Sequence, residues 1–382
     1  MCDLVLLSWN QLGETQACLE TLFDTVHAPV RLLIVDNGSE PPVREFLKAV
    51  APRGLVREVR LLQNETNEGF PRGMNRGIRA STAPYVCLLN NDLRFTDGWL
   101  EELIRVAEAD PANGLVNPLS NTLGHHPPRG VSLQAYAKQR QALRGEFVEL
   151  SKCSGFCLLI RRDVLSRLDG LSEEVERCFF EDEDFAMRAQ RAGYRCAAAL
   201  GAYVYHVEHG SVRLVPEREE LFARNRRWCE GQWGRWLRVA WPRFTPVTPG
   251  AAETRAWLER LLPWARRRAF IHVVCPMPDG VNKDALFRSV GLIPHAGIRW
   301  DAPAPGGPRW GAVGRILARR KKRFDIIVAP EARWQRRLER LRWLHGATVV
   351  PEQDEGRLAE AWQVRSQPAA AAADGQMRPC AS

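Results

Sequence analysis

The stretch YVCLLNNDLRF, residues 85–95, is an apolar run that stops abruptly at Asn90, Asn91 and Asp92. An apolar run of this length predicts a buried strand, and its polar ending is either a turn or part of a site. Apolar runs at 4–9, 30–39 and 56–64 come before it, and stretches with helical spacing separate them. Strands that alternate with helices predict a parallel sheet with right-handed crossovers, hence an α/β fold.

Polar side chains follow each of these predicted strands. The first strand ends at Ser8 and Asn10, the second at Asp36, and the third runs into a loop with Asn67. The carboxyl ends of the strands in an open parallel sheet border the ligand crevice. Four polar endings at one edge therefore predict a binding site rather than four unrelated turns.

The length of 382 residues favours two domains, and 45% hydrophobic residues with 26% charged residues is an ordinary globular composition. A first domain is expected at 1–243, followed by a Pro- and Gly-rich linker at 244–253. A smaller α/β domain of unknown role is expected at 254–366, with strands at 269–276, 324–330 and 346–351. The low-complexity residues 367–382 predict a disordered tail.

The net charge of +9 comes mostly from arginine and does not indicate specific nucleic-acid binding. The ten cysteines form no CxxC pair, and most lie in apolar runs, which predicts buried reduced thiols. The sequence shows no signal peptide or membrane span, so a cytoplasmic protein is expected, with peripheral membrane contact left open. The basic, Trp-rich stretch 221–241 predicts a helix that either packs on the first domain or rests on an anionic membrane.

Seven motifs occur in an order that resembles the family 2 glycosyltransferases. They are SWN, VDNGS, NEGFPRGMNRGI, LLNNDLRF, GFCLLIRRDVL, FFEDEDFAMRAQRAGYR and YHVEHGS. The resemblance covers about residues 1–240. It is strongest to the bacterial subgroup that adds rhamnose or galactofuranose-type sugars to surface polysaccharides. It implies a GT-A fold with a mostly parallel, Rossmann-like sheet flanked by helices, a nucleotide-diphosphate sugar donor carrying UDP or dTDP, and inversion at the anomeric carbon.

The resemblance also implies roles for individual residues. The residues implied to bind the donor nucleotide are Ser8, Asn10, Asp36, Asn67, Gly69, Asn75, Asn90 and Asn91. Gly155 and Phe156 would form the floor near the donor sugar or the acceptor.

A divalent metal, Mn²⁺ or Mg²⁺, would bind Asp92 and His206, with His209 left open as an alternative to His206. Similar enzymes often carry Asp-x-Asp where this chain keeps only Asp92. A metal bound to a diphosphate needs only one or two protein ligands, because phosphate and water oxygens complete its coordination.

The acidic motif FFEDEDF would supply the catalytic base. A sugar hydroxyl is a poor nucleophile until a carboxylate accepts its proton. By resemblance, Asp182 is that base, Glu181 orients it or contacts the acceptor, and Asp184 is structural. The alternative is that acidic residues at a helix start serve only the helix dipole.

The expected function is transfer of a sugar to a hydroxyl of a glycan or lipid-linked glycan acceptor in envelope polysaccharide synthesis. Two alternatives remain open. The first is a degenerate GT-A binding module without turnover. The second is a sugar nucleotidyltransferase, which needs a Gly-rich loop with Arg and Lys after the first strand, and SWNQLGETQ lacks one.

Overall fold

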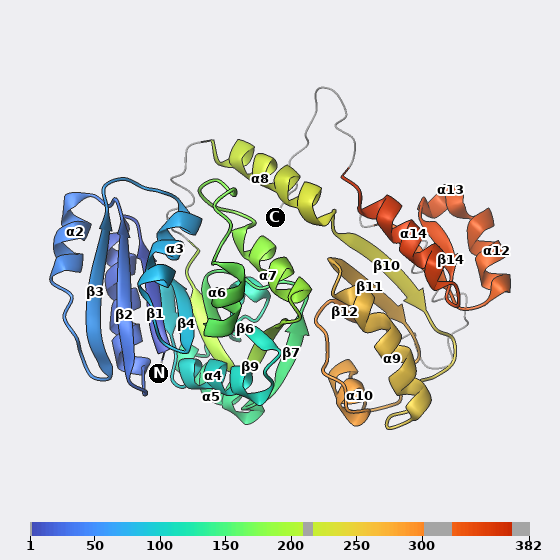
Figure 1. The fold of residues 1–382 in the computed structure, drawn as a ribbon. Coiled ribbons are helices and arrows are strands. Elements are labelled where there is room, and N and C mark those ends of the chain that lie inside the picture. The colour runs from blue at the N-terminus through green and yellow to red at the C-terminus, as the bar shows by residue number, and fades with distance from the viewer. Residues whose placement is uncertain (1, 209–216, 302–322, 369–382) are drawn as a thin grey trace.

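The computed structural model describes residues 2–208, 217–301 and 323–368, which form two sheets with flanking helices (Figure 1). The larger sheet has nine strands among the described residues. In spatial order they are β3 (Val56–Asn64), β2 (Val30–Asn37), β1 (Cys2–Ser8), β4 (Tyr85–Asn90), β8 (Cys157–Arg161), β6 (Asn113–Leu119), β9 (Arg195–His206) and β5 (Leu93–Phe95), with β7 (Phe147–Leu150) also on β9.

Helices cover both faces of this sheet because successive side chains of a strand point to opposite faces. Leu4 and Leu6 of β1 lie in the core formed with α1 (Leu12–Thr25), α2 (Pro41–Lys48) and α4 (Trp99–Ala109). Val5 and Leu7 lie in the opposite core, formed with α3 (Phe70–Ala80), α6 (Arg162–Leu168) and α7 (Glu181–Arg191). This double burial explains why β1 reads as a continuous apolar run.

The predicted α/β class with a second α/β unit is confirmed, while the larger sheet is mixed rather than mostly parallel. Strands β3, β2, β1 and β4 are parallel, but β8 runs antiparallel to both β4 and β6. The direction of β8 depends on where the chain travels between β6 and β8, through η1 (Asn121–Leu123), α5 (Leu133–Arg140), η2 (Gln141–Leu143) and β7. Apolar patterning does not contain that information.

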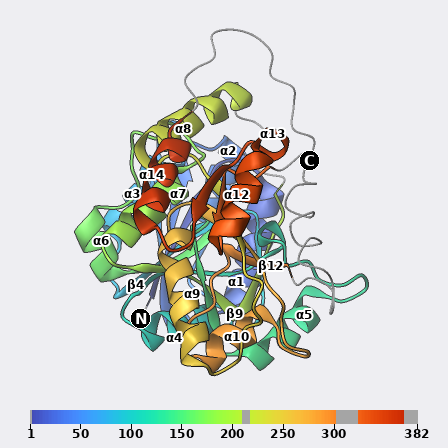
Figure 2. The same ribbon diagram turned by 90° about the vertical axis from the view of Figure 1, so that its right-hand side faces the viewer.

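The second sheet is parallel throughout its described strands. Its order is β12 (Ile298–Asp301), β11 (Ala269–Val274), β10 (Leu237–Pro242), β13 (Ile326–Ala329) and β14 (Thr348–Pro351). Its helices, seen toward the viewer in Figure 2, include α9 (Ala252–Ala265), α10 (Lys283–Ser289), α12 (Ala332–Arg340), α13 (Arg342–His345) and α14 (Glu355–Ser366).

The second sheet begins earlier in the chain than the expected boundary. The predicted single helix over 221–241 is instead α8 (Arg218–Trp233) followed by β10, which is the central strand of the second sheet. The expectation of a first domain reaching residue 243 and a linker at 244–253 therefore differs from the structure. Alternating Arg and Trp resembled an amphipathic helix, but Gly234 at φ 77° ends α8, and the next residues extend.

Three further expectations concern cysteines, membrane segments and the tail. The nine cysteines within the described residues are buried and unpaired, as predicted. Among these residues, no helix has both the length and the apolarity needed to cross a bilayer. The expected disordered tail at 367–382 lies almost wholly outside the described residues.

Backbone pairing connects the two sheets through Glu149 of β7. The Glu149 N–H donates to the Pro294 carbonyl, and the Ala296 N–H donates to the Glu149 carbonyl, both at 2.8 Å. The Glu149 carboxylate also receives two bonds from Arg266, at 2.6 and 2.8 Å. These contacts join an edge strand of the first sheet to the chain that precedes β12.

Candidate active site

Polar residues from three strands meet at one edge of the larger sheet. In the strand register, Ser8 pairs with Asp36 of β2, and Leu7 pairs with Asn90 of β4. Parallel pairing aligns the carboxyl ends of the strands, so endings far apart in the sequence become neighbours. The prediction that these endings share one edge is confirmed.

Asp36 presents an unused acceptor at this edge. Its side chain is fully buried, and Oδ1 accepts a bond from the Ser39 N–H at 2.9 Å. Among the described residues, Oδ2 has no hydrogen bond and lies 3.7 Å from Nε of Arg44. Beside it, the Asn10 N–H donates to Oγ of Ser39 at 3.0 Å. A buried carboxylate oxygen without a donor suits a ligand N–H group.

Three of the residues expected at the nucleotide make contacts within the protein or are fully buried. The Asn75 amide donates to the Leu171 carbonyl at 2.9 Å and to Glu173 at 3.0 Å, and its oxygen accepts from the Leu171 N–H at 2.9 Å. The Asn91 amide donates to Oγ1 of Thr15 at 2.8 Å. The third, Ser8, is fully buried. These contacts fix the positions of the side chains at the edge, and their expected role at the nucleotide stays a prediction.

Asn67 and Gly69 shape the loop before α3. Oδ1 of Asn67 accepts bonds from the Gly69 N–H and from Nδ2 of Asn37, both at 2.9 Å. Gly69 has φ 86°, and a Cβ atom there would lie 2.6 Å from Cα of Arg177. Only glycine fits at position 69, because the backbone of Arg177 lies too close for a Cβ atom. This packing alone explains the glycine, without any ligand.

Asp92 and His206 come together through the pairing of β5 with β9. Leu93 pairs with His206, which places the preceding Asp92 beside the end of β9. Oδ1 of Asp92 lies 3.1 Å from Nε2 of His206, and it is buried without a hydrogen-bond partner among the described residues. Asn90 adds a second such oxygen, and its Nδ2 is 3.5 Å from the same imidazole nitrogen.

This donor set fits a divalent cation shared with a diphosphate. A carboxylate oxygen and an imidazole nitrogen converge without an aligned hydrogen bond between them, as two ligands of one ion would. No group of three or more His, Cys, Asp and Glu side chains with ligand geometry occurs in the described part of the chain. A divalent ion held by Asp92 and His206 would take its remaining ligands from phosphate oxygens and water. The alternative ligand His209 lies outside the described residues.

Asp182 and Glu181 lie at the start of α7, and both line a cavity of about 270 Å³ together with Asn90, Gly155 and His206. Oδ2 of Asp182 accepts from the Gly155 N–H at 3.0 Å, and Oδ1 accepts from the Glu183 N–H at 2.7 Å. A Cβ atom at Gly155 would lie 3.3 Å from the Phe70 ring, so a larger residue there would crowd the cavity wall.

The two carboxyl groups have different electrostatic surroundings. Burial, together with the charge of Asp182, raises the pKa of Glu181 to about 8, and its Oε2 has no hydrogen bond within the described structure. Burial also raises the pKa of Asp182, but the Lys152 ammonium and the Gly155 N–H oppose that shift. Glu181 therefore holds its proton at neutral pH more readily than an ordinary carboxyl group.

The loop before α7 is strained. Arg177, Phe179 and Phe180 all have left-handed φ angles, between 53° and 74°. The rings of Phe179 and Phe180 pack on Phe222 of α8 at 5.3 and 5.1 Å, and all three line the cavity. Left-handed bulky residues are uncommon and occur mainly where function imposes the conformation.

Three residues that sequence reasoning missed support the site. Asn121 forms two hydrogen bonds of 2.8 Å with the backbone of His206, donating to its carbonyl and accepting from its N–H. Asn117 bonds the Ser154 N–H and the Ser154 and Cys157 carbonyls, which shapes the backbone around Gly155. Lys152 lines the cavity beside the acidic motif. Asn117 lies within β6 and Asn121 follows that strand, and their position at an apolar run was their only signal.

The Trp-rich segment packs on the protein, in agreement with the first of the two alternatives. Trp233 Nε1 donates to Oδ1 of Asp184 at 2.9 Å, and Trp236 Nε1 donates to Oε1 of Glu183 at 2.5 Å. Asp184 also bonds Arg188 at 2.8 Å, so its contacts are those of a structural residue.

Comparison with known proteins agrees with this arrangement. Residues 3–169 match the family model described as Glycosyl transferase family 2, so this part of the chain is similar to that family of glycosyltransferases. The match covers the strands from β1 to β8 of the first sheet, where the GT-A fold was expected.

Individual relatives are distant. An uncharacterized protein of Sinorhizobium fredii is 23% identical over 61% of this chain, and the match spans only 27% of that protein. An N-acetylglucosaminyl-diphospho-decaprenol L-rhamnosyltransferase of Mycobacterium tuberculosis is 26% identical over 53% of this chain and 75% of its own. Among solved structures, a mannosyltransferase from Pyrobaculum calidifontis in complex with GDP-Man and Mn²⁺ is 15% identical, with a TM-score of 0.43 over 60% of this chain and 69% of that one.

Proposed function

We propose that this protein is an inverting, metal-dependent glycosyltransferase that moves a sugar from a nucleotide diphosphate to an acceptor hydroxyl. The observation that carries the proposal is that a candidate metal site and a candidate base lie next to the same cavity, which His206 and Asp182 both line. One is the orphaned Asp92 oxygen beside His206, and the other is the Asp182 carboxylate held by two backbone N–H groups. Such a transfer needs both a site for the leaving diphosphate and a base for the acceptor.

The donor would lie along the strand ends. Asp36 has a buried, unused oxygen for an imide N–H of uracil or thymine, and the Asn90 oxygen is free for a ribose hydroxyl. Asp92 and His206 would hold the Mn²⁺ or Mg²⁺ ion, which neutralises the charge that develops on the departing diphosphate.

Asp182 would act as the general base. Its carboxylate accepts the proton of the acceptor hydroxyl, whose oxygen forms a bond to the anomeric carbon. The bond from that carbon to the phosphate oxygen breaks, and its electron pair leaves with the nucleotide diphosphate. The Gly155 and Glu183 N–H groups keep the carboxylate oriented and favour its charged form.

Glu181 would have a different role because it holds a proton at neutral pH. A protonated carboxyl group donates one hydrogen bond and does not compete with Asp182 for the acceptor proton. We assign Glu181 to positioning the acceptor or the donor sugar within the cavity.

The acceptor is proposed to be a glycan or a lipid-linked glycan of envelope polysaccharide synthesis. The proposal rests on the M. tuberculosis relative, whose name gives a lipid-linked sugar as acceptor. The geometry of the cavity supports a hydroxyl nucleophile without specifying the sugar that bears it.

Calorimetric titration with UDP and dTDP, with and without Mn²⁺, tests the donor site. We expect saturable binding of one nucleotide that strengthens with Mn²⁺, and loss of the Mn²⁺ effect in Asp92→Ala. Asp97→Ala is a matched control, because the Asp97 carboxylate is 60% exposed and lies outside the cavity. Binding that ignores both Mn²⁺ and Asp92 would remove the metal assignment.

Donor hydrolysis separates the enzyme from the binding-module alternative. We expect slow Mn²⁺-dependent release of the nucleotide diphosphate from the matching sugar donor. Tight nucleotide binding with no release, and no transfer to any acceptor, would favour a module without turnover.

A further inference from the structure

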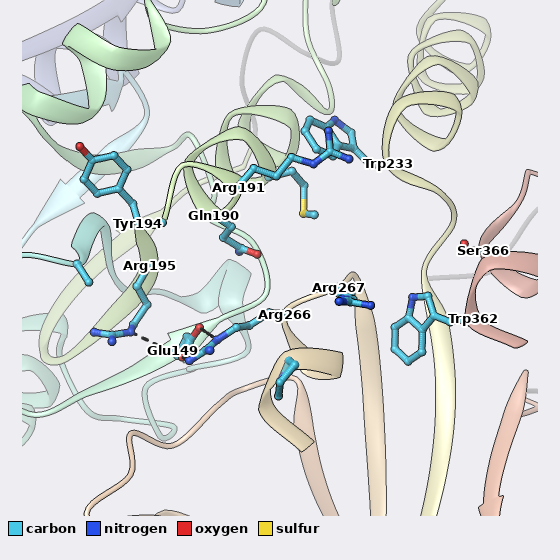
Figure 3. Close-up of a pocket in the computed structure, with 14 residues that line it drawn as sticks. Glu149, Gln190, Arg191, Tyr194, Arg195, Trp233, Arg266, Arg267, Trp362 and Ser366 are labelled. Atoms are coloured by element: carbon cyan, nitrogen blue, oxygen red, sulfur yellow. Dashed lines mark hydrogen bonds and ion pairs between the residues drawn. The ribbon is translucent and has the colours of Figure 1, made fainter. Parts of the chain in front are cut away.

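A second cavity lies between the two sheets, away from the acidic motif. Its volume is about 550 Å³, roughly twice that of the cavity at Asp182. Figure 3 shows its walls: Gln190 and Arg191 of α7 and the Tyr194–Arg195 turn on one side, with Trp233, Arg266, Arg267 and Trp362 on the other. None of the functional residues considered above explains this space.

Two of its four arginines are neutralised by carboxylates. Arg266 forms a bidentate pair with the buried Glu149, and Arg195 bonds Asp110 at 3.0 Å and lies 3.7 Å from Glu149. Two carboxylates thus balance two guanidinium groups. Arg195, Arg266 and Glu149 therefore line the cavity without adding surplus charge to it.

The other two arginines have no carboxylate partner within the described residues. The Arg191 guanidinium lies 4.2 Å from the centre of the Trp233 ring, and that of Arg267 lies 4.9 Å from the Trp264 ring. Cation–π contact holds each side chain while leaving its N–H donors unused. The cavity therefore carries two surplus positive charges, one on each wall, with donors free for an anion.

The remaining lining suits a sugar. Trp233 and Trp362 present indole surface, and apolar ring faces of saccharides stack on such surfaces as other apolar groups do. Oε1 of Gln190 is buried without a hydrogen-bond partner in the described structure, while its Nε2 is used by the Ser151 carbonyl at 3.0 Å. A free buried acceptor calls for a hydroxyl donor from a ligand.

We propose that this cavity binds an anionic saccharide, one that bears a carboxylate or a phosphate group. The anion would pair with Arg191 and Arg267, a hydroxyl would donate to Gln190, and the ring would lie against Trp233 or Trp362. The ligand would be a remote unit of the acceptor glycan only if the proposed function holds. The proposal of a saccharide site does not depend on that function.

The cavity is coupled to the acidic motif through shared elements. α7 carries Asp182 in its first turn and Arg191 at its last residue, about 14 Å apart along the helix axis. Trp233 bonds Asp184 through Nε1 and supports Arg191 with its ring. An acceptor held here would be recognised by its charge at a distance from the reacting hydroxyl.

Calorimetry with three probes tests the proposal: a glucuronate-containing disaccharide, the corresponding neutral glucose disaccharide, and inorganic phosphate. We expect the anionic disaccharide to bind saturably and at least about tenfold more tightly than the neutral one, because charge-assisted bonds are the stronger kind. Weak phosphate binding would show that the charge alone is insufficient. Phosphate that binds as tightly as the disaccharide would overturn the saccharide assignment, and equal binding of the charged and neutral sugars would overturn the role of the arginines.

The variant R191A/R267A provides the residue-level test. Both side chains are exposed, so folding should persist, and we expect about a tenfold loss of affinity for the anionic disaccharide. Arg227→Ala is the control, an exposed arginine of α8 outside the cavity. Unchanged affinity in the double variant would reject the proposal.

UDP binding with Mn²⁺, measured on the same samples, distinguishes the two hypotheses. Retained UDP binding in the double variant is expected, since neither arginine lies at the strand ends. If the wild-type protein binds the anionic disaccharide but not UDP or dTDP, the proposed function fails while the saccharide site stands.

Discussion

At the scale of single residues, the start of α7 places two carboxyl groups side by side in unlike surroundings. Asp182 receives two backbone N–H bonds and lies near Lys152, whereas Glu181 is buried with one oxygen unbonded among the described residues. Burial raises the pKa of both carboxyl groups, but Lys152 and the Gly155 N–H oppose the shift only at Asp182, and the pKa of Glu181 rises to about 8. Neighbouring titratable groups whose surroundings separate their pKa values are typical of acid–base sites.

Replacing Asp182 by Asn should abolish the base while keeping the shape of the side chain. We expect kcat to fall about 10²–10⁴-fold, the usual contribution of a general base, with UDP affinity unchanged. Steady-state transfer kinetics and calorimetry on the same preparation measure the two effects. Undiminished turnover in this variant would assign the base elsewhere.

Glu181 should make stability depend on pH in a defined window. Its pKa is raised from 4.5 to about 8 on folding, so between these values the folded protein keeps a proton that the unfolded chain has lost. The free energy of unfolding should therefore fall as pH rises through the window, by an amount on the order of a few kcal/mol.

Glu181→Gln should remove this fall, because the amide does not ionise. Urea denaturation at several pH values between 5 and 8 measures it, with Glu20→Gln as the exposed control. Wild-type and E181Q curves with the same slope would mean that Glu181 is ionised in the folded protein.

At the scale of elements, the end of β9 is fixed from outside its own strand. Asn121, in the short helix η1 after β6, bonds both the N–H and the carbonyl of His206, and the Phe156 ring stacks on the imidazole at 5.3 Å. The position of the proposed metal ligand thus depends on the β6–η1 connection as much as on β9. Residues that orient a metal ligand are worth about 10–100-fold in metal affinity.

Asn121→Ala should therefore weaken the effect of the metal specifically. We expect the gain in UDP affinity produced by Mn²⁺ to shrink about tenfold, while metal-free UDP affinity stays the same. Calorimetry with and without Mn²⁺ measures both, and Thr122→Ala in the same helix is the control. An equal loss with and without metal would indicate a general disturbance of the edge.

At the scale of the whole molecule, the acidic motif is joined to the second sheet by a buried ion pair. Glu183 follows Asp182 and lies 2.6 Å from Arg268, which immediately precedes β11, and both side chains are 2% exposed. Burial alone would raise the pKa of Glu183, but Lys152 and Arg268 outweigh it and lower the pKa. The position of α7, which carries the proposed base Asp182, therefore depends on the second unit.

Glu183→Gln should destabilise the protein by about 3–5 kcal/mol, because it leaves Arg268 buried without its carboxylate. Urea denaturation measures the loss. The double variant E183L/R268M should lose less than E183Q alone, since an apolar pair leaves no buried charge. A loss of stability in the double variant equal to the sum of the losses in the two single variants would show that the two side chains act independently.

The sequence by itself determined the alternation of strands and helices in the first 110 residues, the shared edge of Ser8, Asp36 and Asn90, and the resemblance to family 2 glycosyltransferases that the match over residues 3–169 supports. Strands buried on both faces must be continuously apolar, and parallel strands must end at one edge, so these features are local and periodic. The prediction that Asp92, Asp182 and His206 line one region came from motif order and is compatible with the geometry.

Only the tertiary structure decided the reversed direction of β8, the membership of β10 in the second sheet, and the commitment of Asn75 and Asn91 to protein contacts. It also decided the burial that raises the pKa of Glu181, and it brought Arg191 and Arg267 to the lining of one cavity. Strand direction, sheet membership and electrostatic surroundings depend on contacts between residues far apart in the chain. A hydrophobic pattern records how deeply a residue is buried, but not which neighbour buries it.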